Sequence, residues 1–286
     1  MGLRVFFSSD MVRYGFLPGT VISELRDVWR NNFIELSLRD TQDAFDVLVV
    51  TPYQGKTLTS EWARYVTNMM IQGVPVVHPG TVYEFFTGRL PIEYMAEELG
   101  VIFRPPLVYP YVKRFIDLIM IALCLFPAIL CTLVIALAAL CSSGRPIFFV
   151  QKRIGKNGVP FLMYKFRSMT ASGEVTSVGR YLRKCHMDEL PQILNVLRGE
   201  MSFIGPRPET PDLAARYARD IPFYPYRYSM RPGITGWAQV NYGYASVTSE
   251  NKIKLGYDLY YIKHASFVLE ISIILKTVKI VLFGFK

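Results

Sequence analysis

One uncharged segment limits what this chain can fold into more than any other feature of its sequence. The 27 residues from Leu118 to Gly144 contain no charged side chain and are mostly apolar. A helix that rises 1.5 Å per residue would be about 40 Å long over this segment, enough to cross the hydrocarbon core of a bilayer. No second stretch of comparable length occurs in the sequence, which argues against a multi-span transporter.

Basic residues stand on both sides of this segment. Lys113 and Arg114 precede it, and it is followed by Arg145, Lys152, Arg153 and Lys156. A membrane-spanning anchor is the simple interpretation, but the positive-inside rule places both ends in the cytoplasm. Pro127 also removes a backbone hydrogen bond near the middle, where it bends or breaks a helix. We therefore expect residues 111–144 to form a re-entrant membrane helix broken at Pro127, with a spanning helix as the alternative.

The first 105 residues have the alternating pattern of a small α/β layer. The expected strands are Arg4 to Phe7, Phe33 to Leu38, Phe45 to Thr51 and Val74 to His78, and the expected helices are Thr20 to Arg30 and Thr59 to Gln72. No glycine-rich phosphate-binding motif accompanies this pattern. The sequence thus predicts a Rossmann-like module over residues 1–105 with a structural or regulatory role.

Charge is distributed unevenly about Pro110. The part before it has 9 basic and 12 acidic residues, a net charge of −3, whereas the part from Pro110 onward has 23 and 11, a net charge of +12. Such a difference indicates that the second part contacts anions, whether nucleic acid, lipid headgroups or a phosphorylated substrate. No aromatic and basic residues occur at the spacing of an RNA-binding motif, so nucleic acid is not favoured.

Two further helices are expected in this basic part. One covers Pro211 to Arg219, and the other covers Phe267 to Phe283, where Lys276 and Lys279 interrupt an apolar sequence. Cations on an apolar helix are typical of a segment that lies in the membrane interface. A C-terminal core helix fits the same pattern. The four cysteines have no metal-ligand spacing and are expected to be reduced thiols.

Adjacent carboxylates at Asp188 and Glu189 are the strongest candidates for chemistry. They follow Arg183 and Lys184 and directly precede an apolar pattern of helical spacing. A carboxylate at such a position is often only a helix cap. However, cations beside a helix N-terminus also form an anion site, in which a carboxylate can bind Mg²⁺ or attack phosphorus. Further cations have stiff Gly- and Pro-rich surroundings and favour a phosphate site; they are Lys165, Arg207 and Arg231.

Several motifs occur in a fixed order from Lys113 to about Ser266. They are Lys113-Arg114 with Asp117 and Pro127, Gly144 to Phe149, Gln151 to Gly155, Tyr164 to Met169, Asp188 to Gln192, Gly205 to Pro208, Arg231 to Asn241 and Tyr257-Asp258. By these motifs, residues 111–286 resemble the bacterial sugar transferases that are monotopic polyprenyl-phosphate phosphoglycosyl transferases. The fold implied is a mixed α+β catalytic domain over residues 145–286, with interfacial amphipathic helices.

The resemblance implies an enzyme at the cytosolic face of the bacterial inner membrane. It would transfer sugar-1-phosphate from a UDP-sugar to polyprenyl (undecaprenyl) phosphate and release UMP, the first membrane step of glycan or exopolysaccharide assembly. Asp188 would form a covalent phosphosugar intermediate, Glu189 would assist, and both would hold Mg²⁺. The resemblance makes Lys165, Arg183 and Arg207 phosphate-binding residues, with Arg231 and Asp258 as further candidates.

The chain also departs from this family. Larger members carry several membrane spans before the catalytic part, which residues 1–105 do not provide, and short members lack a module of that length. Tyr242-Gly243-Tyr244 stands where the family often has Gly-Arg, which puts any substrate contact of that Arg in doubt. The alternatives are a nucleotide-sugar glycosyltransferase of another type, although no Asp-x-Asp occurs, or a membrane scaffold that binds anionic lipid. The N-terminal module could mediate formation of a homo-oligomer.

Overall fold

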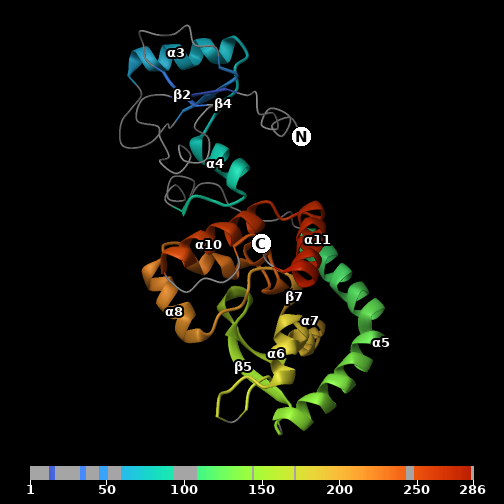
Figure 1. Cartoon of the computed structure of the whole chain (residues 1–286). Helices are drawn as coiled ribbons and strands as arrows, with labels where there is room; N and C mark the ends of the chain where they lie inside the picture. Colours follow the sequence, from blue (N-terminus) through green and yellow to red (C-terminus); the bar gives the residue numbers. More distant parts are fainter. Residues whose placement is uncertain are drawn as a thin grey trace. The chain divides into compact units, whose positions relative to one another are not determined.

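The structure is a computed structural model that describes residues 13–16, 33–36, 45–50, 59–92, 108–143, 145–170, 172–242 and 248–284. The chain divides into two compact units, Met1–Gly100 and Val101–Lys286. Figure 1 shows the helices and strands of both units along the chain. Each unit is described by itself.

The first unit contains a small parallel sheet. Its strands are β1 (Tyr14–Phe16), β2 (Phe33–Glu35), β3 (Val47–Val49) and β4 (Val76–Val77), in the order β2-β1-β3-β4. All three pairings between neighbouring strands are parallel. Helix α3 (Ser60–Ile71) precedes β4, and helix α4 (Pro79–Thr87) follows it.

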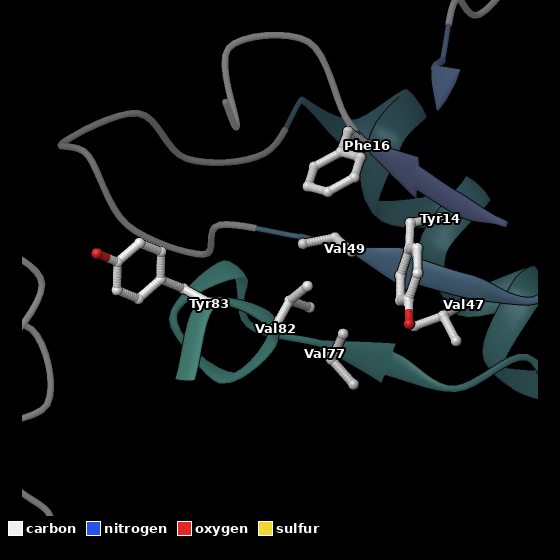
Figure 2. Packing of buried hydrophobic residues seen from close by; sticks show 7 residues of the cluster. All are labelled: Tyr14, Phe16, Val47, Val49, Val77, Val82 and Tyr83. Atoms are coloured by element: carbon white, nitrogen blue, oxygen red, sulfur yellow. The ribbon is translucent and has the colours of Figure 1, made fainter. Parts of the chain in front are cut away.

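The two faces of this sheet carry two separate apolar clusters, because side chains alternate along a strand. Val47 and Val49 pack with Val82 of α4 on one face, as Figure 2 shows. Leu48 and Val50 pack with Val66 of α3 on the other face. The uninterrupted apolar run of β3 therefore has the pattern of a strand that is covered on both faces.

The sequence predicted some of these elements and missed two, β1 and α4. Strands lie within the expected ranges Phe33 to Leu38, Phe45 to Thr51 and Val74 to His78, and α3 lies within the expected helix Thr59 to Gln72, with the Thr59 hydroxyl as its N-cap. Strand β1 was not predicted, because Gly15 at its centre has a low strand propensity. The expected strand Arg4 to Phe7 and helix Thr20 to Arg30 lie outside the described residues.

The second unit begins with the long apolar helix α5 (Tyr109–Ser143). The predicted break at Pro127 is wrong: the helix continues through this proline and instead follows an arc, which is drawn in green in Figure 1. A proline within a helix removes one backbone hydrogen bond, and the chain can absorb that loss by bending without an interruption. An 18-residue window, Leu125–Ser142, is long and apolar enough to cross a membrane, and little of it is buried.

Both ends of α5 pack on the second unit, and the middle does not. Lys113 and Ile121 are buried near its start, and Ile135 and Ala139 are buried near its end. Between them the large apolar side chains are exposed, with Phe126 at 81%. An apolar surface of this kind marks contact with a membrane or another protein.

The remaining elements of the second unit are a hairpin and a series of helices and short strands. They are β5 (Phe148–Ile154), η2 (Lys156–Gly158), β6 (Pro160–Phe166), α6 (Ser177–Lys184), η3 (Met187–Gln192), α7 (Ile193–Arg198), β7 (Ser202–Ile204), α8 (Pro211–Asp220), η4 (Tyr224–Ser229), β8 (Gly233–Thr235), α9 (Trp237–Tyr242), α10 (Thr248–Lys263) and α11 (Phe267–Phe283). Strands β5 and β6 pair antiparallel, and β7 and β8 pair parallel. The second unit is thus a mixed assembly of helices and strands, with one membrane-type helix among its described residues.

Helix α11 has the exact bounds that the sequence predicted and combines features of both interpretations. Glu270 and Ile273 are buried against the unit, whereas Val268, Leu275 and Leu282 are exposed on the outside. One face therefore belongs to the core, and the other offers an apolar surface.

Candidate functional site

The two carboxylates lie in the short 3₁₀ helix η3, directly after α6. His186 precedes this helix with a positive φ of 55°, in the turn between α6 and η3. Asp188 and Glu189 are in the first turn of η3, and both are buried, at 9% and 7% exposure. The structure brings Glu189 together with two of the predicted phosphate-binding cations.

Lys165 and Arg207 both contact the Glu189 carboxylate. The Lys165 Nζ atom donates to Glu189 Oε1 over 2.6 Å, and an Arg207 guanidinium nitrogen donates to the same oxygen over 2.7 Å. Lys165 comes from β6, whereas Arg207 comes from the loop after β7. Three segments that are distant in sequence thus meet at one buried carboxylate.

These two cations control the ionisation of Glu189. Burial alone would raise the pKa of Glu189, but Arg207 and Lys165 outweigh burial and lower the pKa to about 2. Glu189 is therefore ionised at any physiological pH, and it holds Lys165 and Arg207 in place. With Arg183 nearby, three cations face the two carboxylates Asp188 and Glu189, which leaves a net charge of +1 for an incoming anion.

Asp188 differs from its neighbour in its contacts. Among the described residues, no side chain forms a hydrogen bond or an ion pair with Asp188. Burial and the charge of Glu189 raise the pKa of Asp188, although Lys165, His186 and Arg183 oppose the increase. A carboxylate with a raised pKa and no fixed partner is suited to nucleophilic attack or to metal binding, and not to a cap.

Arg183 lies near the dyad but does not touch it. Its Nε atom donates to the Ser168 hydroxyl over 2.8 Å. Helix α6 approaches Ser168 so closely that a Cβ on Gly179 would lie 2.1 Å from the Ser168 carbonyl oxygen. Glycine at that position therefore permits the contact between Arg183 and Ser168, and Arg183 acts on Asp188 through its charge.

The loop that carries Arg207 is fixed by a close backbone crossing. A Cβ on Gly233 would lie 2.1 Å from the Gly205 backbone nitrogen, so no larger residue fits there. Gly205 donates a backbone hydrogen bond to Thr235, and Gly233 donates one to Pro206. These bonds set the position of Arg207 two residues after the crossing.

A second group of charges supports the same loop from behind. Arg227 donates to the Arg207 backbone oxygen over 2.9 Å and to Asp258 Oδ2 over 2.7 Å. Arg227 and Asp258 are almost completely buried, and Glu209 lies 3.7 Å from Arg227. Asp258, predicted as a phosphate contact, therefore pairs with Arg227 and lies behind the loop that holds Arg207.

Arg231 is also separate from the dyad. Its Nε atom donates to the backbone oxygen of Gly199, which follows the C-terminal end of α7. The dyad precedes the N-terminal end of α7. The structure therefore does not bring Arg231 into contact with Asp188 or Glu189.

Asn195 is a structural residue of the site that the sequence analysis missed. It is fully buried, donates to the Leu162 backbone oxygen over 2.7 Å and accepts from the Tyr164 backbone nitrogen over 3.3 Å. These bonds join α7 to β6, one residue before Lys165. No signal in the sequence pointed to it, because at about 100° per residue Asn195 lies on the side of the helix opposite the apolar positions Leu190, Ile193, Leu194 and Leu197.

The low pKa of Glu189 predicts how acid affects stability. A carboxylate whose pKa falls from an ordinary 4.5 to about 2 on folding stabilises the protein above pH 4.5, and that stabilisation is lost as the pH falls toward 2. We expect the thermal midpoint of the wild type to fall more steeply over this range than that of Glu189→Gln. Equal slopes in thermal scans of the two proteins would contradict the ion pairs with Lys165 and Arg207.

The site combines a buried carboxylate dyad with nearby cations, and the same unit has a long helix whose apolar middle is exposed. These features together define a membrane-associated enzyme that acts on anionic groups. The family profile described as bacterial sugar transferase matches residues 108–284, and the chain belongs to this family. The resemblance expected from the sequence motifs is confirmed.

Three relatives illustrate the range of this similarity. The UDP-N-acetylgalactosamine-undecaprenyl-phosphate N-acetylgalactosaminephosphotransferase of Aeromonas hydrophila is 39% identical over 96% of this chain and 68% of its own length. The UDP-glucose:undecaprenyl-phosphate glucose-1-phosphate transferases of Caulobacter vibrioides and Escherichia coli are 39% and 38% identical over 58% of this chain. The match covers 68% of the Caulobacter protein but only 39% of the Escherichia coli protein.

Proposed function

We propose that this protein is a phosphoglycosyl transferase that moves sugar-1-phosphate from a UDP-sugar to undecaprenyl phosphate, releasing UMP. The observation that carries this proposal is the different state of two adjacent carboxylates. Glu189 is fixed by Lys165 and Arg207, whereas Asp188 has no hydrogen bond or ion pair among the described residues. The names of the relatives support the donor and acceptor classes.

In the first step, a carboxylate oxygen of Asp188 attacks the phosphorus that carries the sugar. A phosphosugar–aspartate bond forms as the bond from this phosphorus to the bridging oxygen breaks, and UMP leaves with the electron pair. In the second step, a phosphate oxygen of undecaprenyl phosphate attacks the same phosphorus and releases Asp188. Lys165, Arg207 and Arg183 stabilise the negative charge that develops on the phosphoryl oxygens.

Magnesium fits this site when a substrate contributes ligands. Among the described residues, no group of three metal-binding side chains occurs, so the protein alone offers no complete cage. Asp188 and Glu189 would hold the ion together with phosphate oxygens, which is how proteins commonly bind Mg²⁺. When bound, the ion neutralises charge on the diphosphate.

Metal removal provides a test of this assignment. EDTA is expected to reduce UMP release below detection, because the cations of the site do not neutralise the diphosphate alone. Excess Mg²⁺ added after EDTA should restore the rate, measured by UMP formation. A full rate in EDTA would contradict the magnesium assignment and leave the covalent mechanism standing.

We further propose that α5 enters and leaves the membrane on one face, which would be the cytosolic face of the bacterial inner membrane. Buried residues occur near both of its ends, and the large apolar side chains between Ile121 and Ile135 are exposed, which supports re-entry over a spanning helix. The exposed apolar side of α11 would then lie in the interface of the same leaflet.

Cysteine labelling tests this topology. Val108→Cys and Val159→Cys are introduced one at a time into a variant without native cysteines. Val108 and Val159 are exposed and lie before and after α5. Both should react with a membrane-impermeant maleimide from the same side of sealed inverted vesicles. Labelling of the two positions from opposite sides would mean that α5 spans the bilayer.

The N-terminal unit is proposed to be a structural or regulatory module that supports self-association. The Aeromonas relative matches nearly the whole chain, so it shares sequence with this unit as well as with the catalytic unit. Removal of the module should leave phosphotransfer chemistry intact, because the dyad and its cations lie in the second unit.

The proposed activity is tested with undecaprenyl phosphate and a panel of UDP-sugars, with the released nucleotide identified by chromatography. UMP with at least one of the UDP-sugars is the expected product. Release of UDP would indicate a glycosyltransferase of another type. Release of neither nucleotide with any donor would favour a membrane scaffold.

A further inference from the structure

A second group of cations surrounds a pocket at the start of α5, and the proposed chemistry does not use it. The pocket lies between the first turns of α5, the turn η2, the start of β7 and the segment that leads into β8. Its lining consists of Pro110, Lys113, Asp117, Lys156, Ser202, Ser229, Met230 and Arg231. This lining contains three cations and one carboxylate.

Two of these cations are available to a ligand. Arg231 is half-buried and is held by the bond from its Nε atom to Gly199, whereas its terminal nitrogens have no partner within the described part of the chain. Lys156 is also half-buried, and among the described residues its ammonium group forms no ion pair. A guanidinium that is fixed at Nε presents its remaining donors in a rigid arrangement that suits phosphate.

The other charged groups of the pocket are already compensated. Lys113 pairs with Glu270 over 2.6 Å, and Tyr109 also donates to that carboxylate. Asp117 accepts hydrogen bonds from the Ser202 hydroxyl over 2.8 and 3.0 Å. Counting Glu270 with the lining, three positive and two negative charges leave a net charge of +1. The pocket therefore attracts an anion.

The surroundings of the pocket indicate that its ligand is attached to a lipid. Tyr111 and Phe115, on the same turns of α5, are 78% and 64% exposed. They precede the apolar middle of the helix, so they lie where α5 would enter the bilayer. Basic pockets at this level beside membrane helices commonly bind phosphorylated headgroups.

We infer that this pocket binds the phosphate of a membrane lipid, at a site separate from the catalytic dyad. Arg231 reaches the C-terminal end of α7, whereas Asp188 and Glu189 lie before its N-terminal end. The bound phosphate thus holds the start of α5 at the membrane surface and takes no part in phosphotransfer. This inference does not depend on the proposed enzymatic activity, because binding alone tests it.

The test uses the full chain in detergent and the double variant Lys156→Gln/Arg231→Gln. Binding of phosphatidylglycerol, undecaprenyl phosphate and inorganic phosphate is measured by native mass spectrometry and by the shift in thermal midpoint. Diacylglycerol, which lacks phosphate, is the ligand control. Arg219→Gln removes an exposed cation of α8 and is the matched variant control.

The wild type and Arg219→Gln should bind phosphatidylglycerol and show no shift with diacylglycerol, whereas the double variant should bind at least about tenfold more weakly. Variant-sensitive binding of undecaprenyl phosphate alone would keep the phosphate site but would overturn the claim that it stands apart from phosphotransfer. Variant-sensitive binding of inorganic phosphate without either lipid would overturn the lipid assignment. Equal affinity of all three proteins for every phosphate-containing probe would overturn the site itself.

Discussion

Asp188→Asn is expected to lower the rate of UMP release by about a thousandfold or more, because an amide cannot form the phosphosugar–aspartate bond. The substitution preserves the size of the side chain, and Asp188 has no hydrogen-bond partner among the described residues that would be lost. The variant should therefore fold with the thermal midpoint of the wild type. UMP release with undecaprenyl phosphate present measures the effect.

Glu189→Gln distinguishes the two carboxylates. It also slows the reaction, but it releases Lys165 and Arg207 from their shared partner and should change the thermal midpoint as well. If Asp188→Asn reacted at the wild-type rate, Asp188 would not be the nucleophile, whatever the effect of Glu189→Gln.

The second large effect is expected on stability, for Asp258→Ala. This substitution leaves Arg227 completely buried without its closest carboxylate, and breaking a buried pair in this way costs about 3–5 kcal/mol. Because Arg227 also donates to the Arg207 backbone, the Arg207 loop should become mobile and activity should fall as well. The free energy of unfolding, measured by denaturant titration, gives the magnitude.

The matched control is Asp220→Ala, which breaks an ion pair on the surface of α8. Arg216 and Asp220 are 3.8 Å apart and their side chains are 60% and 42% exposed. Exposed pairs of this spacing contribute about 0.3–0.5 kcal/mol. Losses of similar size in Asp220→Ala and Asp258→Ala would contradict the supporting role of the buried pair.

Much of the local structure could be predicted because it depends on local patterns. The bounds of α11 follow from apolar spacing, and α3 lies within the helix expected over Thr59 to Gln72. The membrane-type helix follows from 27 uncharged residues. A break of this helix was predicted at Pro127, since the sequence does not show whether neighbouring contacts keep both halves in one helix.

The site required contacts that are distant in sequence. Lys165, Glu189 and Arg207 were chosen as separate candidates, and their shared contact depends on how β6, η3 and the loop after β7 pack. Asp258 was expected to bind phosphate, and its pairing with Arg227 depends on how α10 packs against η4. Arg231 was expected to bind phosphate because of its Gly- and Pro-rich surroundings and the family resemblance, but its position relative to α7 depends on tertiary structure.

The most direct test of the proposed chemistry is a reaction of the wild-type protein with a UDP-sugar and Mg²⁺ in the absence of any acceptor lipid. We expect up to one equivalent of UMP per protein chain and a mass increase of one sugar phosphate on the peptide that contains Asp188. Undecaprenyl phosphate added afterwards should remove this mass. UMP release that strictly requires the acceptor, with no modified peptide at any time, would contradict a covalent intermediate on Asp188.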